Sequence, residues 1–263
     1  MKLVLIFVKR LLMNPYAIGF GIGYTYFMIA VGAFILSSNY EYGPVYYTAA
    51  WYGTVVLVST SMFASSIGMM ISYHSGGLSF LTRFSRLTPK YYLLSLYLTV
   101  TATLLIVSVL MLAGVISLFS YRFGELILPE DWGLSFLDVV LSGMFYMPLV
   151  LLLEEATVVT SRKLSRAVTF IPYFLAIMFG FYYYNLDLTN MAYYNPFVVI
   201  ELLAEQSFST KMIPLNYNDL HGPTLNIGYS IASVLTWCLL LSLASIVMFR
   251  RLYYKPLEEG RFV

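Results

Sequence analysis

Long apolar runs separated by short polar stretches form the dominant pattern along this chain. A helix that crosses about 30 Å of hydrocarbon needs around 20 apolar residues, and six runs fit that requirement. We predict membrane-spanning helices at about 16–36, 48–71, 91–118, 136–158, 168–184 and 226–249. None of them carries Lys or Arg at its centre, where insertion would cost roughly 2.5–3.5 kcal/mol. The pattern therefore predicts an all-α, polytopic membrane protein with six transmembrane helices.

Residues 1–14 precede the first run. Their pattern predicts a helix that lies in the plane of the lipid headgroups. Lys2 and Lys9 share one side of such a helix. The opposite side is apolar and carries Val4, Phe7, Val8 and Leu11. This division of faces is typical of interfacial helices. The apolar stretch is too short for a signal peptide and has no small-residue cleavage site. The alternative is that residues 1–13 extend the first span into the cytosol.

The composition agrees with a membrane protein. Of the 263 residues, 60% are hydrophobic and 11% are charged, whereas about a quarter of the residues in a soluble domain are charged. The predicted inner loops are short, at about 72–90 and 159–167, and the longest outer loop is about 185–225. We therefore expect residues 1–263 to form one membrane domain.

The basic residues predict the orientation of this domain. Thirteen of the 15 Lys and Arg residues fall in four clusters: Lys2, Lys9 and Arg10; Arg83, Arg86 and Lys90; Arg162, Lys163 and Arg166; and Arg250, Arg251, Lys255 and Arg261. Basic residues beside membrane spans are retained on the cytoplasmic side. All four clusters and both termini are therefore expected in the cytoplasm, which requires an even number of spans and predicts a multi-pass protein of the cell membrane.

Hydroxyl and glycine positions predict how some helices pack. The second span carries hydroxyl groups all around its circumference: Ser59, Thr60, Ser61, Ser65 and Ser66. We therefore expect this helix to be surrounded by protein. Gly19 and Gly23 form a small-xxx-small pair on the first span, which permits close approach of another helix. We favour packing within the chain over a contact with a second copy.

Three dipeptides indicate helix starts, and two prolines indicate kinks. Asn14-Pro15, Asn195-Pro196 and Thr88-Pro89 each place a capping side chain before a proline at the first helical position. Pro148 and Pro172 lie inside the predicted fourth and fifth spans, where each removes a backbone hydrogen bond. We expect each to kink or locally loosen its helix.

The sequence carries little that indicates enzyme chemistry. His74 and His221 are predicted on opposite sides of the membrane, and Cys238 is the only cysteine, so we expect neither a metal site nor an intrachain disulfide. The pair Glu154-Glu155 lacks the following Arg and the histidines of prenyl-protein-type intramembrane proteases. No Gly-x-x-x-x-Gly-Lys-Ser/Thr motif is present, so no phosphate-binding loop of that kind is available. We expect no enzymatic activity and no cofactor bound by this chain.

The layout resembles the permease subunits of type-2 ATP-binding-cassette exporters. Two stretches carry the resemblance: Gly-Gly-Leu-Ser-Phe-Leu-Thr-Arg-Phe-Ser-Arg-Leu-Thr-Pro at 76–89, and Asn-Pro-Phe at 195–197 with Glu-Leu at 201–202. The first lacks the acidic residue often found early in it. With the helix at 1–14, six spans and inner termini, the resemblance covers nearly the whole chain.

The resemblance implies partners for the chain. A separate ATPase subunit would bind ATP and magnesium, and a second permease, identical or related, would complete the pathway. The first inner loop would form a short coupling helix docked on the ATPase through Leu78, Leu81, Arg83, Phe84 and Arg86. Arg162, Lys163 and Arg166 on the second inner loop would add to this contact. The alternative is that these basic residues only fix the orientation and touch lipid phosphates.

On the outer side, residues 196–208 predict a short helix. Glu201 and Glu205 lie on one side of it. In the resembling family this region dips into the membrane and closes the pathway from outside, which implies an external gate at Asn195, Pro196, Phe197 and Glu201. A surface helix with a solvated acidic face is an equally open alternative.

The expected function is the export of an apolar or amphipathic substrate, because no charged residue is expected at mid-membrane. The polar groups of the pathway would then be Tyr26, Tyr146, Tyr173 and Trp237. The alternative is a membrane scaffold without transport activity. A secondary transporter is disfavoured, because its coupling ion would need a buried carboxylate and none is expected at mid-depth. The expected partners are lipids and protein subunits, and not nucleic acid.

Overall fold

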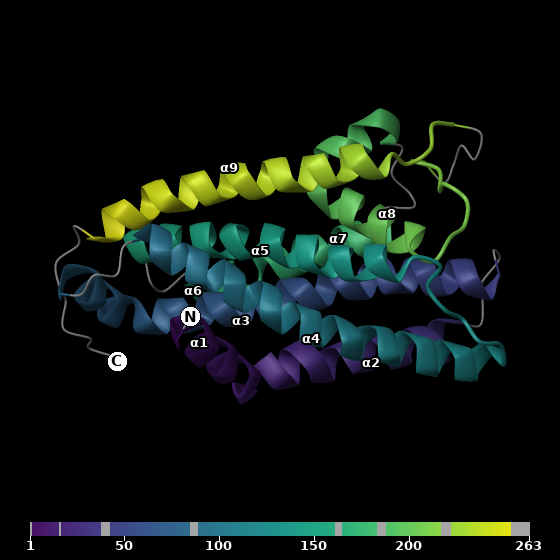
Figure 1. Cartoon of the computed structure of the whole chain (residues 1–263), viewed down its shortest axis with the longest axis horizontal. Coiled ribbons are helices and arrows are strands. Elements are labelled where there is room, and N and C mark those ends of the chain that lie inside the picture. Colours follow the sequence, from purple (N-terminus) through teal and green to yellow (C-terminus); the bar gives the residue numbers. More distant parts are fainter. Residues whose placement is uncertain are drawn as a thin grey trace.

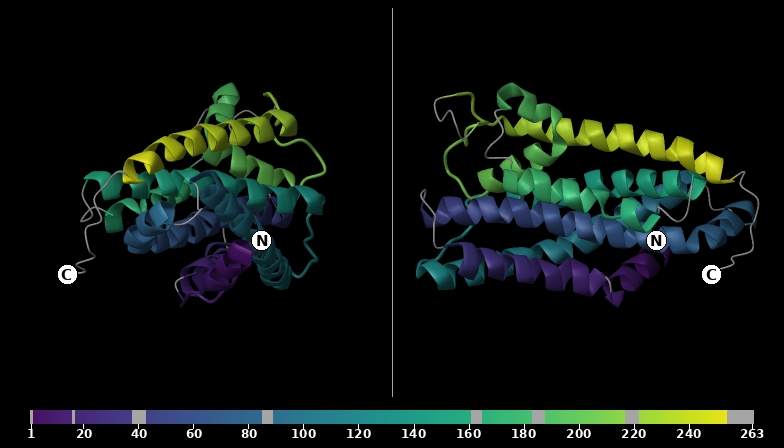
Figure 2. Two further views of the ribbon diagram at one scale, coloured as in Figure 1. Left: turned by 60° about the vertical axis from the view of Figure 1, so that its left-hand side comes forward. Right: turned by 180° about the vertical axis from the view of Figure 1, so that it is seen from behind.

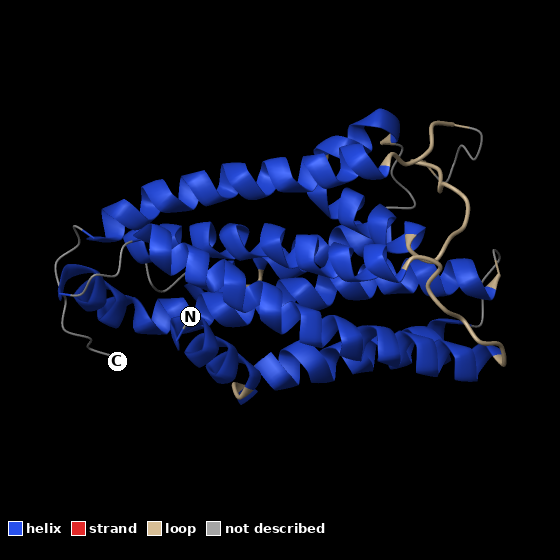
Figure 3. Cartoon of the chain, in the orientation of Figure 1, coloured by secondary structure: helices blue, strands red, loops and turns tan. Residues whose placement is uncertain are grey.

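The computed structural model of the chain describes residues 2–15, 17–37, 43–84, 89–160, 165–182, 188–216 and 222–253. These residues form helices joined by loops, and no β-strand occurs among them (Figure 3). The all-helical class predicted from the sequence is confirmed for this part of the chain.

The first helical elements are α1 (Lys2–Leu12) and a stretch in which π-helices η1 (Ala17–Gly23) and η2 (Val31–Leu36) flank α2 (Tyr24–Ala30). Three long helices follow: α3 (Pro44–Phe84), α4 (Pro89–Phe123) and α5 (Trp132–Thr160). The remaining elements are α6 (Ser165–Val168), α7 (Ile171–Tyr182), the 3-10 helix η6 (Thr189–Tyr194), α8 (Pro196–Gln206) and α9 (Ile227–Tyr253). The predicted helix starts at Pro89 and Pro196 are confirmed.

Within the described ranges, four helices are long and apolar enough to cross a membrane. Their candidate spans are Pro44–Gly68, Leu94–Phe123, Trp132–Thr157 and Ile227–Met248, which overlap four of the six predicted spans. The other two predicted spans contain shorter apolar helices, at Gly21–Leu36 and Ile171–Phe181. The second of these is short because the chain turns before Ile171. Pro172 therefore lies in the first turn of α7, where proline is tolerated, and the kink expected at Pro172 is wrong. Pro148 lies inside α5, as predicted, and its effect on the helix axis stays a prediction.

The long helices run roughly along one axis, and α1 lies oblique to it (Figures 1 and 2). The end of α3, the start of α4, the end of α5 and the end of α9 lie together at one end of the bundle. The opposite end carries α8 and the loop between α4 and α5. The helix ends nearest the last three basic clusters thus share one end of the bundle.

Helix α3 forms the centre of the bundle. In its most apolar stretch, 94% of the residues are buried, so the prediction that protein surrounds this helix is confirmed. The helix has 41 residues and is about 60 Å long at 1.5 Å per residue. It continues without a break to Phe84. We expected a separate short coupling helix in the first inner loop, at 76–88. For residues 76–84 this expectation is wrong, because they form the end of α3.

The first helical stretch packs on α3 through glycines other than those predicted. A Cβ atom at Gly21 would lie 2.7 Å from the ring of Phe63, and one at Gly32 would lie 2.6 Å from the ring of Trp51. A Cβ atom at Gly19 would meet nothing within 4 Å, and one at Gly23 would meet only its own helix. The expected packing of the Gly19–Gly23 pair within the chain is therefore wrong, and its contact with a second copy stays a prediction.

Candidate functional site

Helix α8 is enclosed by the rest of the chain along its full length. Its start follows the predicted capping pattern, because the Asn195 side chain accepts a hydrogen bond of 3.1 Å from the backbone N–H of Phe197 and Pro196 occupies the first turn. Every residue from Pro196 to Gln206 is buried. The alternative of a surface helix with a solvated acidic face is therefore wrong.

Aromatic contacts hold the start of α8 against α5 and α7. The Phe197 ring stacks on Phe179 of α7 with centroids 5.2 Å apart. It meets Phe145 and Tyr146 of α5 edge-on, at 5.2 Å and 5.8 Å. Such aromatic pairs stabilise by about 0.5–1.5 kcal/mol beyond their buried area. Phe197, predicted as part of an external gate, is thus one of the residues that pack α8 into the bundle.

Glu201 lies directly on α3, where a glycine makes room for it. The Thr54 hydroxyl donates a hydrogen bond of 3.1 Å to Oε1 of Glu201. A Cβ atom at Gly53 would lie 2.8 Å from Cδ of Glu201 and 3.1 Å from its carbonyl oxygen. Any side chain at position 53 would therefore displace the carboxyl group of Glu201.

Further acidic and phenolic groups surround this carboxyl group. We call the set Asp138, Tyr146, Glu201 and Glu205 the α8 carboxyl site. All four side chains are buried. Asp138 and Glu205 lie within electrostatic range of Glu201, and so does Tyr146. Both oxygens of Asp138, the Tyr146 hydroxyl and Oε2 of Glu201 are buried without a hydrogen-bond partner.

Burial controls the ionisation of Glu201, which lies outside the four candidate spans. Burial raises the pKa of the Glu201 carboxyl well above its usual range, and the neighbouring Glu205 and Asp138 raise it further. The hydrogen bond from Thr54 opposes this shift only in part. The cause is general, since a buried charge without an opposite charge loses more hydration than nearby groups replace.

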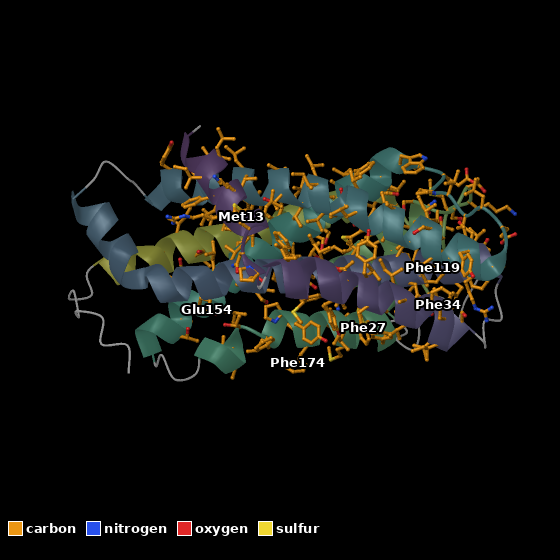
Figure 4. The ribbon with its side chains drawn as sticks, turned by 90° about the horizontal axis from the view of Figure 1, so that it is seen from below. Met13, Phe27, Phe34, Phe119, Glu154 and Phe174 are labelled. Atoms are coloured by element: carbon orange, nitrogen blue, oxygen red, sulfur yellow. The ribbon has the colours of Figure 1, made fainter. Side chains whose placement is uncertain are left out.

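A second pair of buried carboxyl groups, Glu154 and Glu155, lies near the end of α5. Glu154 is in the half of the bundle away from α8 (Figures 1 and 4). The hydroxyl of Ser245 on α9 donates to both oxygens of Glu155, at 3.1 Å and 3.0 Å. Thr169 donates to Glu154, and its carbonyl oxygen accepts a 2.9 Å bond from Ser65 of α3. Glu154 and Glu155 each accept a hydrogen bond from a hydroxyl group, whereas both oxygens of Asp138 in the α8 carboxyl site lack a partner.

Among the described residues, five carboxyl groups are thus buried: Asp138, Glu154, Glu155, Glu201 and Glu205. Asp138 lies near the start of α5 and Glu154 near its end, so the expectation that no carboxylate lies at mid-depth, which disfavoured a secondary transporter, stays a prediction. Asp138 and Glu205 were missed as site residues because acidic residues were assigned to the outer ends of spans. Asp138 does lie within the predicted fourth span, and an ionisable residue inside a span is in general a candidate functional residue.

The four predicted pathway residues do not converge on one another. Tyr26 donates a 2.9 Å bond to the Leu110 carbonyl oxygen of α4, and Tyr173 shares a 2.6 Å bond with Tyr24. Trp237 donates a 3.0 Å bond to the carbonyl oxygen of Tyr194. These three residues join neighbouring elements. Tyr146 is the member of the set that belongs to the α8 carboxyl site.

The predicted coupling residues are only partly among the described residues. Arg86, Arg162 and Lys163 lie outside the described residues. Only the helical backbone is described for the others: Leu78, Leu81, Arg83 and Phe84 in α3, and Arg166 in α6. The docking role of these residues stays a prediction.

Among the described residues, no group of three or more His, Cys, Asp or Glu side chains is placed to hold a metal ion. In comparisons with known proteins, no protein-family model, no curated protein and no solved structure matches this chain.

Proposed function

We propose that this chain is the membrane-spanning permease subunit of an ATP-binding-cassette exporter. It would move an apolar or amphipathic substrate across the cell membrane, with ATP hydrolysed by a separate subunit and with a second permease completing the pathway. Six spans and cytoplasmic termini belong to this proposal. The helices from Ala17 to Leu36 and from Ile171 to Tyr182 would then supply the first and fifth spans.

The observation that carries the proposal is the continuity of α3. Its candidate span ends at Gly68, and the helix continues to Phe84, which adds about 24 Å at 1.5 Å per residue. This extension contains Leu78, Leu81 and Arg83 of the predicted docking segment. The same helix holds Glu201 of α8 through Gly53 and Thr54. One rigid element therefore joins the expected ATPase contact to the expected external gate.

This connection suggests how ATP hydrolysis would act on the pathway. A displacement of the α3 extension by the ATPase would move the helix against which α8 is seated. Since α8 also packs on α5 and α7 through Phe197, a shift of α3 changes the fit of α8 among three helices. The external gate would respond without any nucleotide bound to the permease itself.

A charge inside the expected apolar contact tests the proposal. Leu81→Asp should separate ATP hydrolysis from transport, because it places a charge where an apolar anchor docks. The matched variant Arg83→Lys with Arg86→Lys retains the positive charge but loses the planar guanidinium groups. Because exposed ion pairs contribute about 0–1 kcal/mol each, we expect only a modest loss of affinity for the ATPase. Subunit pull-down and transport-stimulated hydrolysis measure both effects. Wild-type behaviour of Leu81→Asp in both assays contradicts the proposal.

The purified chain alone should neither bind nor hydrolyse ATP.

A membrane scaffold without transport activity would co-purify with partners yet show no hydrolysis stimulated by a substrate. An ion-coupled secondary transporter is a second candidate, because Asp138 and Glu201 are buried and buried carboxyl groups commonly mark ion pathways. A secondary transporter would move its substrate without any ATPase subunit. Transport measured after reconstitution of the chain by itself therefore distinguishes it from the proposed permease.

A further inference from the structure

We propose that the α8 carboxyl site is a proton-binding site, in which Asp138 and Glu201 are held as neutral carboxylic acids between α3, α5 and α8. Release transfers a proton from each carboxyl group to water and leaves a carboxylate. The proposal does not depend on the partner ATPase.

The two oxygens of Glu201 have different surroundings, as a protonated carboxyl group requires. A neutral carboxylic acid has one oxygen that only accepts and one that carries a hydrogen. Oε1 accepts the hydrogen bond from Thr54. Oε2 is buried and has no hydrogen-bond partner, so it is the oxygen free to carry the proton.

The Tyr146 hydroxyl does not supply the donor that a Glu201 carboxylate would need. It is fully buried, has no hydrogen-bond partner and lies within electrostatic range of Glu201. The ring contact between Tyr146 and Phe197, at 5.8 Å, places this side chain against α8. A Glu201 carboxylate would therefore receive no hydrogen bond from Tyr146 at Oε2, and a charged oxygen that is buried without a donor is unfavourable.

Asp138 lacks the donors that would stabilise a carboxylate. Both of its oxygens are buried without a partner. The neighbouring Tyr52 hydroxyl donates its hydrogen bond of 3.0 Å to the carbonyl oxygen of Ser135 and not to Asp138. An ionised group in this position would be a buried charge with neither a hydrogen bond nor a counter-charge, and protonation removes that penalty.

Among the described side chains, those of the elements packed against α8 supply no positive charge to the site. The groups that face it are acidic or phenolic: Tyr52, Asp138, Tyr146 and Glu205. Titratable side chains described on α7, α9 and η6 make other hydrogen bonds: Tyr173 with Tyr24, Cys238 with Met144 and Tyr193 with Asn226. Tyr194 and Tyr229 are exposed. The site is therefore neutralised by protons or by a bound cation. The described side chains do not group into a metal site, which favours protons.

The test combines infrared spectroscopy with thermal unfolding of the purified chain between about pH 5 and about pH 9, a range above the usual pKa of Glu. The folded state retains protons that the unfolded state releases, so the melting temperature should fall as pH rises. The carbonyl band of protonated carboxyl groups should weaken over the same range. Glu201→Gln and Asp138→Asn, which imitate the neutral acids, should each remove part of this band and flatten the dependence of melting temperature on pH.

Glu130→Gln is the matched control, because Glu130 is exposed in the loop before α5 and should leave both measurements unchanged. If both site variants retain the full band and the full slope, the proposal is overturned. It is also overturned if sodium chloride in place of choline chloride raises the melting temperature at high pH and abolishes the slope, because the ligand is then a cation. Neither measurement involves an ATPase, so failure here is distinct from failure of the permease proposal.

Discussion

Helices α3 and α9 are both long and apolar enough to cross a membrane, yet they have opposite surroundings. In their most apolar stretches, 94% of the residues of α3 are buried and only 17% of those of α9. The candidate span of α3 carries seven Ser and Thr residues and that of α9 carries five, but all seven are buried on α3 and only two on α9. The exposed helix presents large apolar side chains, among them Leu235, Leu239, Leu240, Leu243 and Val247.

The contrast follows from the bilayer as a solvent. Lipid is as apolar as leucine, so burial of leucine between membrane helices gains little, whereas hydrogen bonds between helices do contribute. Helix α3 makes such bonds with several neighbours: Ser59 with Thr25 of α2 at 2.6 Å, Thr60 with Ser142 of α5 at 2.6 Å and Thr54 with Glu201 of α8 at 3.1 Å. Polar positions therefore mark the protein interior, and α9 is suited to face lipid.

Truncation of a large side chain should give the largest difference between the two helices, measured as the loss of free energy of unfolding. Tyr52 of α3 is fully buried, whereas Leu243 of α9 is 61% exposed. Tyr52→Ala should lower the free energy of unfolding by about 3 kcal/mol or more, because it leaves a cavity. Leu243→Ala should change it by at most about 0.5 kcal/mol. Unfolding of both variants in the same detergent measures this, and equal losses would contradict the assignment of α3 to the interior.

A smaller effect is expected from adding one methyl group to α3. Gly53→Ala should cost about 1–3 kcal/mol, because the new Cβ would lie 2.8 Å from Cδ of Glu201. Gly19→Ala is the control, since its Cβ meets nothing within 4 Å and alanine favours helix by up to about 1 kcal/mol over glycine. The comparison uses thermal unfolding of the two variants. A stabilising Gly53→Ala would show that α8 is not seated on α3 at this point.

The smallest effect is expected from single hydroxyl groups. Thr60→Val removes the hydrogen bond to Ser142 and should cost about 0.6 kcal/mol, the average for such bonds between membrane helices. Thr236→Val on α9 removes only a bond to the Ala232 carbonyl oxygen of its own helix and should be neutral. A double-mutant cycle of Thr60→Val with Ser142→Ala measures the coupling energy of the pair. A coupling energy of zero would contradict the claim that hydroxyl contacts of α3 stabilise the bundle.

The sequence predicted the helical elements better than their environment. Hydroxyl groups around α3 indicated burial correctly, and Asn195-Pro196 placed the start of α8, because both signals are local. The burial of Glu201 was left open, since it depends on Gly53 and Phe179, which lie far from it in the sequence. The partnerless oxygens of Asp138 and Tyr146 depend on where the neighbouring donors point. No spacing along the chain contains that information.

The central claim, that the bundle crosses the membrane with its basic end in the cytoplasm and α8 toward the outside, is tested most directly by labelling single cysteines in intact cells. Cysteines at Ser38, Tyr121 and Asn216 should react with an impermeant reagent from outside. Cysteines at Ser75, Ser165 and Glu258 should react only after permeabilisation. Labelling of position 165 in intact cells would contradict the orientation, the six-span arrangement and the permease function built on them.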